Sequence, residues 1–400
     1  MTKQRKNNEG SIYEDRIRGG FRVQIRMPGT GKRITKRFQD YDSAERWKDE
    51  QMHRLGCGQF ISPGDTTLGE WLLKWMKLYN LQNVRQRTFE RNVSLIKHCD
   101  SIAHIKIQDL LPSHFQHLYL EMKQYSGETK KKVHNLLHQA LDQAVNERII
   151  QSNPIDSVKA PRVVRTEIET FTPQSLQRVL EAAKGHRWHP SLLLAATTGM
   201  RLGEVLGIRW QDVDLKAKEV YVQQTLQHAN TGIIFEEPKT KASRRKISIP
   251  LPTIMAMEKL RASLGDIVLP ESLCFTAGNG SPIQPKNYHR WWTDVQRKAN
   301  EDWVKIKNKI ATLKKQKKTE EDEYKTLLIA QKSLEKSLHK NFHVLRHTHA
   351  TLLLANGVPV IEVSRRLGHS KTSITLDRYG HAIPGHDQII AEQVPKIYGI

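Results

Sequence analysis

The spacing of apolar residues changes along this chain of 400 residues, and the change limits the folds that it can adopt. Near the N-terminus, Phe21, Val23, Ile25 and Met27 alternate with polar residues, which is the period of two expected of a strand with one buried face. Between residues 68 and 150 the apolar residues instead recur three or four positions apart, as on the buried face of a helix. The sequence therefore predicts a mainly α-helical, multidomain protein with small antiparallel sheets.

The first block, residues 1–60, should form a three-stranded meander followed by a helix. The turn-forming residues 28–31 separate the strand around Val23 from a second candidate strand at 32–38. Asp42 or Ser43 can cap the helix that follows. Such a sheet has one apolar face and one basic face.

The second block, residues 65–156, should hold four or five helices. Asn153 and Pro154 are expected to end the last of these helices, because a residue before proline is disfavoured in the α conformation. The basic residues at 159–165 then form a candidate linker.

The third block, residues 165–400, should be mostly helical with one small sheet. Thr172 is expected to cap a helix that starts at Pro173. Strand-like pieces follow at 220–226, 233–236 and 246–249, and helices resume at 251.

The charge of the chain favours a polyanionic partner. The formal net charge is +22 and the pI is about 9.8, so nucleic acid is the leading candidate. A membrane is disfavoured because no apolar run approaches about 18 residues and the N-terminus leads into no signal core. The cysteines (Cys57, Cys99 and Cys274) are few, far apart and without zinc spacing, so we expect buried thiols in a cytoplasmic protein.

Five short stretches carry the chemistry. They supply a candidate set of two arginines (Arg201 and Arg346), a lysine (Lys239), two histidines (His343 and His369) and a tyrosine (Tyr379), and they are TGMRLGE at 198–204, PKT at 238–240, HVLRH at 343–347, LGH at 367–369 and RY at 378–379. In this order and spacing, the set resembles the tyrosine recombinases, the family of the phage and transposon integrases. The resemblance implies a DNA substrate, a tyrosine nucleophile and a covalent intermediate.

Two arginines suit the transition state of phosphodiester cleavage, in which charge grows on the non-bridging oxygens. Arginine stays charged at every relevant pH and donates two hydrogen bonds to one phosphate, so Arg201 and Arg346 are assigned to the scissile phosphate. A helix start near Thr198 and Gly199 would aim backbone amides at the same anion. Glu204, one turn after Arg201, is expected to fix that arginine.

Tyr379 is the candidate nucleophile, because a phenolate both attacks and leaves readily and so makes cleavage reversible. The resemblance implies that it takes the 3′-phosphate and frees a 5′-hydroxyl, with no cofactor and no metal. A lysine in the turn around residues 238–241 can act as the general acid, and the resemblance favours Lys239 over Lys241 of the same turn. His343 would be the general base or a phosphate donor, and His369 a second donor.

A zinc site is the rival interpretation of the histidines. His343 and His347 are four residues apart and would share a helix face, with His349 or His369 completing the set. The glutamate of a HExxH motif is missing, since Val344 stands in its place. We therefore interpret His347 and His349 as helix-surface or packing residues.

The resemblance extends to the domains and partners. It implies an arm-type DNA-binding domain at 1–60, a helical core-binding domain at 65–156, and a catalytic domain at 165–400 that contains a helical insertion at about 300–341. The candidate DNA contacts are Arg22, Gln24 and Arg26 on the sheet and Lys130, Lys131 and Lys132 on a helix; a solvated strand face is the alternative for the first three. The implied partners are double-stranded DNA at core and arm sites and a homotetramer on DNA, with room for an accessory DNA-bending or directionality factor.

Three functions compete for this pattern. The leading one is a site-specific recombinase that integrates or excises a mobile element such as a prophage. A topoisomerase-like nicking and closing enzyme would use the same residues without the arm-type domain. A non-catalytic DNA-binding regulator would keep the fold, but the complete set of six residues argues against it.

Overall fold

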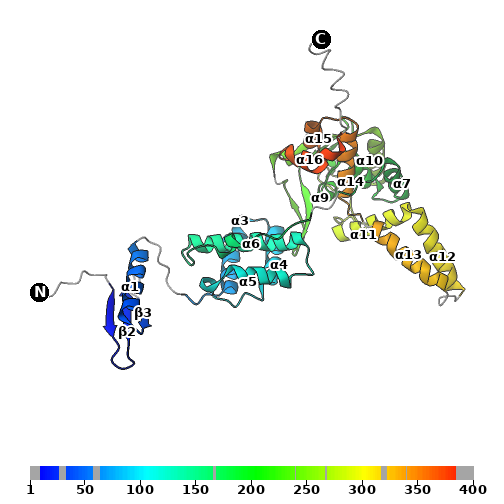
Figure 1. Cartoon of the computed structure of the whole chain (residues 1–400). Helices are drawn as coiled ribbons and strands as arrows, with labels where there is room; N and C mark the ends of the chain where they lie inside the picture. The colour runs from blue at the N-terminus through cyan, green and yellow to red at the C-terminus, as the bar shows by residue number, and fades with distance from the viewer. Residues whose placement is uncertain are drawn as a thin grey trace, which may run out of the picture. The chain divides into compact units, whose positions relative to one another are not determined.

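The computed structural model describes residues 10–26, 33–56, 64–164, 168–238, 240–265, 268–316, 322–338 and 340–383. The chain divides into two compact units, Met1–Arg165 and Thr166–Ile400, and Figure 1 traces the helices and strands of each. Within the described ranges, no helix combines the length and the apolar character that crossing a bilayer requires.

The N-terminal sheet has the predicted three strands. β1 (Ser11–Glu14), β2 (Phe21–Arg26) and β3 (Arg33–Phe38) are antiparallel neighbours in chain order, and α1 (Tyr41–Gly56) packs on the apolar face through Val23, Ile25 and Ala44. Met27 and the turn at 28–31 lie outside the described residues.

The expected cap of α1 is wrong by two or three residues. The helix begins at Tyr41, before both Asp42 and Ser43. The carboxylate of Asp40 accepts the backbone N–H of Ser43 at 2.7 Å, which satisfies a free donor of the first turn.

The rest of the first unit is helical, as predicted. Its core is a single apolar cluster, in which the Trp71 indole donates to the carbonyl of Ala140 at 2.8 Å and so ties the first helix to the last. The elements are α2 (Leu68–Trp75), a π-turn (Met76–Asn80), α3 (Leu81–Asn83), α4 (Gln86–Ile96), α5 (Pro112–Glu121) and α6 (Gly127–Asn146), with short 3₁₀ turns at Lys97–Cys99, Ile107–Asp109 and Pro154–Ser157.

The last of these helices ends earlier than expected. α6 stops at Asn146, because Arg148 adopts a left-handed conformation with φ of +57° that an α-helix cannot continue. Asn153 does not end the helix; its side chain accepts the N–H of Ile155 at 3.1 Å and caps the 3₁₀ turn.

The second unit is mainly helical with two small sheets. One sheet has the order β4-β5-β8 and the other pairs β6 with β7. The elements are α7 (Pro173–Ala182), α8 (His189–Thr198), α9 (Leu202–Leu206), a 3₁₀ turn (Trp210–Asp212), β4 (Val213–Asp214), β5 (Glu219–Val222), β6 (Thr225–Ala229), β7 (Gly232–Glu236), a 3₁₀ turn (Lys241–Ser243), β8 (Arg245–Ser248), α10 (Leu251–Ser263), α11 (Pro285–Ala299), α12 (Glu301–Lys315), α13 (Asp322–Leu338), α14 (Val344–Ala355), α15 (Val360–Leu367), α16 (Ser373–Tyr379) and a 3₁₀ turn (Gly380–Ala382).

The expected single sheet is wrong, because the piece at 220–226 is two strands. β5 ends at Val222, and the side-chain amide of Gln224 then donates to the carbonyl of Gly207 at 2.8 Å. β6 passes so close to α9 that a Cβ on Gly203 would lie 2.5 Å from the carbonyl oxygen of Leu226. This close approach to α9 takes the chain out of the first sheet and into a second one.

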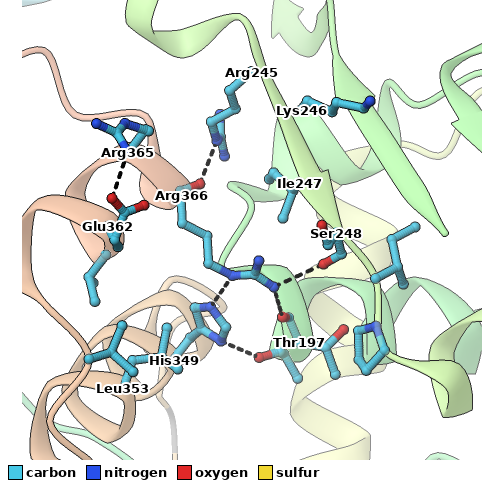
Figure 2. A pocket seen from close by; sticks show the side chains of 15 residues that line it. Thr197, Arg245, Lys246, Ile247, Ser248, His349, Leu353, Glu362, Arg365 and Arg366 are labelled. Carbon is cyan, nitrogen blue, oxygen red and sulfur yellow. Dashed lines mark hydrogen bonds and ion pairs between the residues drawn. The ribbon is translucent and has the colours of Figure 1, made fainter. Parts of the chain in front are cut away.

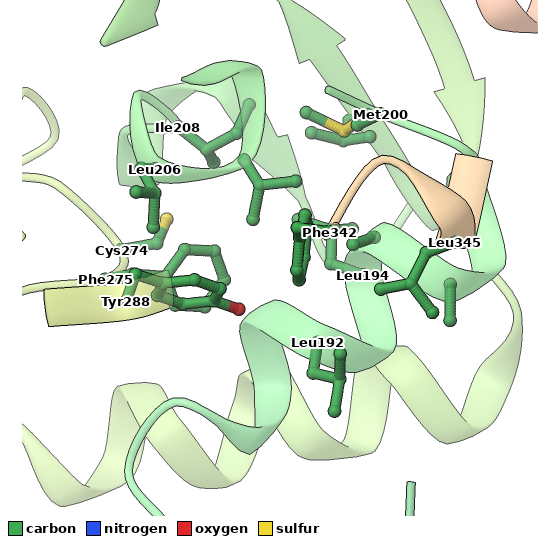
Figure 3. Packing of buried hydrophobic residues seen from close by; sticks show 14 of the residues in the cluster. Leu192, Leu194, Met200, Leu206, Ile208, Cys274, Phe275, Tyr288, Phe342 and Leu345 are labelled. Atoms are coloured by element: carbon green, nitrogen blue, oxygen red, sulfur yellow. The ribbon is translucent and has the colours of Figure 1, made fainter. Parts of the chain in front are cut away.

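A buried apolar core underlies both sheets. Figure 3 shows side chains from distant segments meeting in it, among them Leu194, Leu206, Phe275 and Phe342. Tyr288 is fully buried, and its hydroxyl is satisfied by the Ser191 hydroxyl at 2.7 Å. Cys99 and Cys274 are buried free thiols, as predicted, whereas Cys57 lies outside the described residues.

The insertion is a helical hairpin. α12 and α13 pack along each other (Figure 1). Asn300 caps α12 by accepting the N–H of Trp303 at 2.9 Å. At its base, the Trp292 indole and the Gln296 amide both donate to the carbonyl of Lys340, at 2.7 and 3.1 Å. These bonds tie the end of the insertion to α11.

Candidate active site

Glu204 holds two arginines at one end of the site. Its carboxylate accepts the backbone N–H and the Nη1 of Arg201 at 2.9 and 2.8 Å, and it also accepts Nη2 of Arg245 at 2.9 Å. Burial alone would raise the pKa of Glu204, but Arg245 and Arg201 outweigh it and lower the pKa to about 2. The prediction that Glu204 fixes Arg201 is confirmed, and Arg245 is a further partner.

The helix start expected at Thr198 and Gly199 is wrong. Gly199 ends α8 in the left-handed conformation, with φ of +67°, and α9 begins only at Leu202. A Cβ on Gly199 would lie 2.8 Å from both His349 and Leu367, so only glycine fits this close turn. The carboxylate of Glu204 already takes the N–H of Arg201, so the arginine side chains, rather than backbone amides, supply the positive charge.

Arg346 lies in the interior, with only 2% of its surface exposed. Its guanidinium donates to the carbonyls of Gly199 at 2.9 Å and Leu367 at 2.7 Å, which fixes its plane between α8 and α15. Burial and the charge of Arg201 lower the pKa of Arg346 to about 9, so the side chain remains a cation at neutral pH.

The two predicted histidines are neutral in the free protein. Burial, together with the neighbouring charges of Arg346 and Arg201, lowers the pKa of both His343 and His369 to about 3. The Nδ1 of His369 is hydrogen-bonded to the hydroxyl of Thr375 at 2.8 Å.

Tyr379, at the end of α16, is fully buried, and its hydroxyl contacts His347. The hydroxyl oxygen lies 2.6 Å from the Nδ1 of His347. Burial raises the pKa of the Tyr379 phenol, while Arg346 and Arg378 act in the opposite direction. Of the two interpretations of His347, packing agrees with the structure, because its ring is half-buried against the rings of His343 and Tyr379. The hydrogen bond to the tyrosine was not expected from the sequence.

His349 is a packing residue, as predicted. Its Nδ1 is hydrogen-bonded to the carbonyl of Ala196 at 3.1 Å, and its Nε2 accepts the Nε of Arg366 at 3.1 Å. Arg366 also donates to the carbonyls of Thr197 and Ser248, at 2.8 and 3.1 Å, as Figure 2 shows beside an open pocket of about 1100 Å³. Sequence reasoning missed Arg366, which ties α15 to α8 and β8.

The sequence and the fold match those of known proteins. The model of the phage integrase family matches residues 169–386. The chain belongs to the phage integrase family. A second model, the phage integrase N-terminal SAM-like domain, matches residues 67–123 of this integrase.

Relatives of this chain are named as recombinases and integrases. A tyrosine recombinase XerC-like protein of Caldanaerobacter subterraneus is 29% identical, over 90% of this chain and 92% of the relative. The ICEBs1 integrase of Bacillus subtilis is 23% identical, over 68% of this chain and 67% of the relative. The prediction of a tyrosine-type site-specific DNA recombinase is confirmed at the level of the family.

Solved structures share the fold. The Tn1549 transposon integrase, in complex with a circular intermediate DNA, aligns with a TM-score of 0.63 at 21% identity, covering 82% of this chain and 98% of that one. A lambda integrase tetramer bound to a Holliday junction aligns with a TM-score of 0.54 at 17% identity, covering 96% and 99%. The predicted fold class is confirmed.

The lysine of the integrase site stays a prediction. Lys239 lies outside the described residues, and of Lys241 only the backbone is described, in the 3₁₀ turn before β8. The turn is closed by Thr240, whose hydroxyl accepts the N–H of Ser243 at 3.2 Å.

The candidate DNA contacts of the first unit also stay predictions. Arg22 and Arg26 are exposed on β2. On α6, Lys131 is exposed, whereas Lys130 donates to the carbonyl of Tyr119 at 3.1 Å and Lys132 pairs with Glu128 at 2.9 Å. Gln24 is half-buried.

Among the described residues, one group of three side chains is spaced to hold a metal, and it is not in the recombinase site. It comprises His138, Asp142 and Asp156 of the first unit. Both ring nitrogens of His138 lie 2.9 Å from a carboxylate oxygen, one on each aspartate, so the three side chains contact one another directly.

Proposed function

We propose that this integrase cuts and rejoins DNA through a covalent 3′-phosphotyrosyl intermediate on Tyr379, with Arg201 and Arg346 on the scissile phosphate. One observation carries the proposal: the Tyr379 hydroxyl lies 2.6 Å from the Nδ1 of His347, which directly follows Arg346 on α14. The charges of Arg346, Arg378 and Arg201 also oppose the rise in the pKa of Tyr379 that burial causes. The nucleophile and the cationic site for the phosphate are therefore a single site.

The free donors of the site suit a phosphate. Arg346 uses two of its five N–H groups on main-chain carbonyls, which leaves three for phosphate oxygens. The Arg201 side chain is 41% exposed and so remains open to a ligand. An anion between these arginines would raise the pKa of His343 and His369, which would then become donors to the same phosphate.

The reaction proceeds by one exchange at phosphorus in each direction. The Tyr379 oxygen attacks, the bond to the 5′-oxygen breaks, and a general acid, Lys239 in this proposal, protonates the departing oxygen. The bond energy stays in the phosphotyrosyl link, so a 5′-hydroxyl from another strand can reverse the step without a cofactor.

Domain roles and assembly belong to the same proposal. We assign 1–60 to arm-site DNA, 65–156 to a clamp on core-site DNA, and 165–400 to catalysis, with integration or excision of a mobile element as the outcome. The DNA complexes of the Tn1549 and lambda integrases, the latter a tetramer on a Holliday junction, support double-stranded DNA as the substrate and a tetramer as the active form. Recombining two duplexes needs four cuts and hence four tyrosines.

The test is a suicide substrate with a nick near the cut, which traps the covalent adduct. Wild-type protein should form the adduct, and Tyr379→Phe should bind the same DNA and form none. Tyr221→Phe, on β5 of the same unit, is the matched control and should behave as wild type. Adduct formation by Tyr379→Phe would show that the nucleophile is another residue.

Two further experiments identify the general acid and test the alternative function. Lys239→Ala and Lys241→Ala, compared side by side, decide which lysine is the acid, because only the loss of the acid slows cleavage by about 10²-fold or more. Relaxation of a supercoiled plasmid without paired sites would favour the topoisomerase-like alternative.

A further inference from the structure

The contact between His347 and Tyr379 gives a role to a residue outside the expected catalytic set. The Tyr379 hydroxyl oxygen and the His347 Nδ1 are 2.6 Å apart, which is a short hydrogen bond between the nucleophile and a titratable ring. The Tyr379 side chain is fully buried, so a proton leaving its oxygen must first go to a group of the protein.

We propose that His347 is the general base that takes the proton of Tyr379 when the tyrosine attacks the phosphate. The inference rests on the proposed function, because it needs Tyr379 to be the nucleophile. It assigns to His347 the role that the sequence left open for His343.

The other two histidines are engaged differently. His369 is hydrogen-bonded to Thr375 through Nδ1, at 2.8 Å. His343 stands edge-on to His347, with ring centroids 4.6 Å apart and planes at 86°, while His347 in turn contacts the Tyr379 ring at 5.6 Å. The three rings are in contact in the order His343, His347, Tyr379, and His347 is the one beside the reacting oxygen.

The charges around His347 set when it can act. It faces Arg346 of α14, His343 just before α14 and Arg378 of α16, and Arg201 lies close enough to influence the tyrosine. Burial and the arginines lower the pKa of His347 to about 4, so the ring is neutral and free to accept a proton at neutral pH. A DNA phosphate bound among these cations would raise that pKa, so the base would become stronger once the substrate is in place.

Every bond and proton in the proposed step can be accounted for. A lone pair of the Tyr379 oxygen forms the bond to phosphorus, the bond from phosphorus to the 5′-oxygen breaks, and the phenolic proton moves to the Nδ1 of His347. The 5′-oxygen takes its proton from the general acid. When a 5′-hydroxyl attacks in the reverse direction, the imidazolium of His347 returns its proton to the tyrosine oxygen.

The experiment pairs two changes and follows the single-turnover rate of adduct formation on the nicked substrate. His347→Asn keeps an acceptor oxygen near the position of Nδ1 but cannot carry the proton, so we expect a rate on the order of 10²-fold below wild type at neutral pH. Replacing Tyr379 by a fluorinated tyrosine, whose phenol ionises at lower pH, should recover most of that loss in the variant and change the wild-type rate little.

The outcomes separate the two claims. An asparagine variant that cleaves as fast as wild type, or a loss that the fluorinated tyrosine does not recover, overturns the base role, since a positioning role would not respond to the acidity of the phenol. If wild-type protein forms no adduct, the proposed function fails as well. Equal DNA affinity of the variant shows that it is folded.

A measurement on the unmodified protein needs no variant. In ¹⁵N NMR of the histidine rings, His347 should be the neutral tautomer with its proton on Nε2, because Nδ1 must be the acceptor. A proton on Nδ1, which would make the ring the donor to the tyrosine, overturns the inference.

Discussion

Glu204 is a shared counterion for two arginines: Arg201, which the proposed function places on the phosphate, and the structural Arg245. The carboxylate is 4% exposed and contacts both Arg201 and Arg245 within 3 Å. Buried ion pairs add little net stability when complete, but the loss of one partner leaves an uncompensated charge. We therefore expect substitution of Glu204 to be costly, although its proposed role includes no contact with the phosphate.

Glu204→Gln should lower the free energy of unfolding by about 3 kcal/mol and slow adduct formation, because Arg201 loses its positioning partner. Denaturant unfolding at pH 7 measures the first effect. The folded pKa of Glu204 is about 2 against 4.5 in an unfolded chain, so its stabilisation is complete above pH 4.5 and fades toward pH 2. The gap between wild type and variant should narrow over that range.

The matched control is Glu237→Gln, which removes a carboxylate from an exposed pair with Arg244. It should leave the unfolding midpoint unchanged. An equal decrease in the free energy of unfolding in Glu204→Gln and Glu237→Gln would mean that burial does not increase the cost of losing the Glu204 carboxylate.

At the residue scale, chemistry and motif were enough to single out candidate side chains, and the structure tests their contacts. Arg201, Glu204, Arg346 and Tyr379 were named before any coordinates, and the contacts of Glu204 are as expected. The contact of His347 with Tyr379 was not expected, because the two residues are 32 positions apart in sequence and only the packing of α14 against α16 brings them together.

At the element scale, α15 is the part of the fold on which the site depends. Arg366 anchors it to α8 and β8, and the next carbonyl, that of Leu367, accepts from Arg346. The left-handed Gly368 then ends the helix and leads the chain to His369. A shift of α15 would move an arginine partner and a predicted phosphate donor at once.

Arg366→Met keeps the aliphatic length but removes three hydrogen bonds, so we expect it to cost about 2 to 4 kcal/mol of stability and to slow adduct formation. Arg365→Met is the adjacent control: Arg365 is exposed and pairs with Glu362, and its loss should change neither. Thermal unfolding and the suicide-substrate assay measure both variants. Indistinguishable results for the two positions would contradict the anchoring role.

Element positions were predictable where local pattern decides them. Thr172 caps α7 as expected, by accepting the N–H of Ser175 at 3.2 Å, and the helices of the first unit follow their apolar spacing. The early end of α6 at Asn146 and the break after Val222 were missed. The break depends on the contacts of β6 with α9, and such tertiary constraints leave no periodic signal in a short segment.

At the scale of the whole molecule, two units and a net charge of +22 predict DNA contacts spread over the chain. Each neutralised phosphate should contribute about 0.9 to the slope of log affinity against log salt. Electrophoretic titrations on DNA containing its sites should therefore show a steep fall in affinity between low and physiological salt. A flat response would contradict the interpretation of the charge as an interface.

The same titration separates the units. Arg22→Gln with Arg26→Gln, both on β2, should reduce the slope by up to about 2 on arm-site DNA and leave core-site binding unchanged, which serves as the internal control. An unchanged slope on arm-site DNA would favour the alternative of a solvated strand face.

The arginines in the interior of the second unit are held mainly by peptide carbonyls. Arg346 binds those of Gly199 and Leu367, Arg245 that of Arg366, and Arg366 those of Thr197 and Ser248. Every amino acid supplies a carbonyl, so sequence drift at most of these positions leaves the acceptors in place as long as the backbone keeps its path. A recombinase built this way can diverge until fewer than a third of its residues match a relative and still present its guanidinium groups in the same orientation.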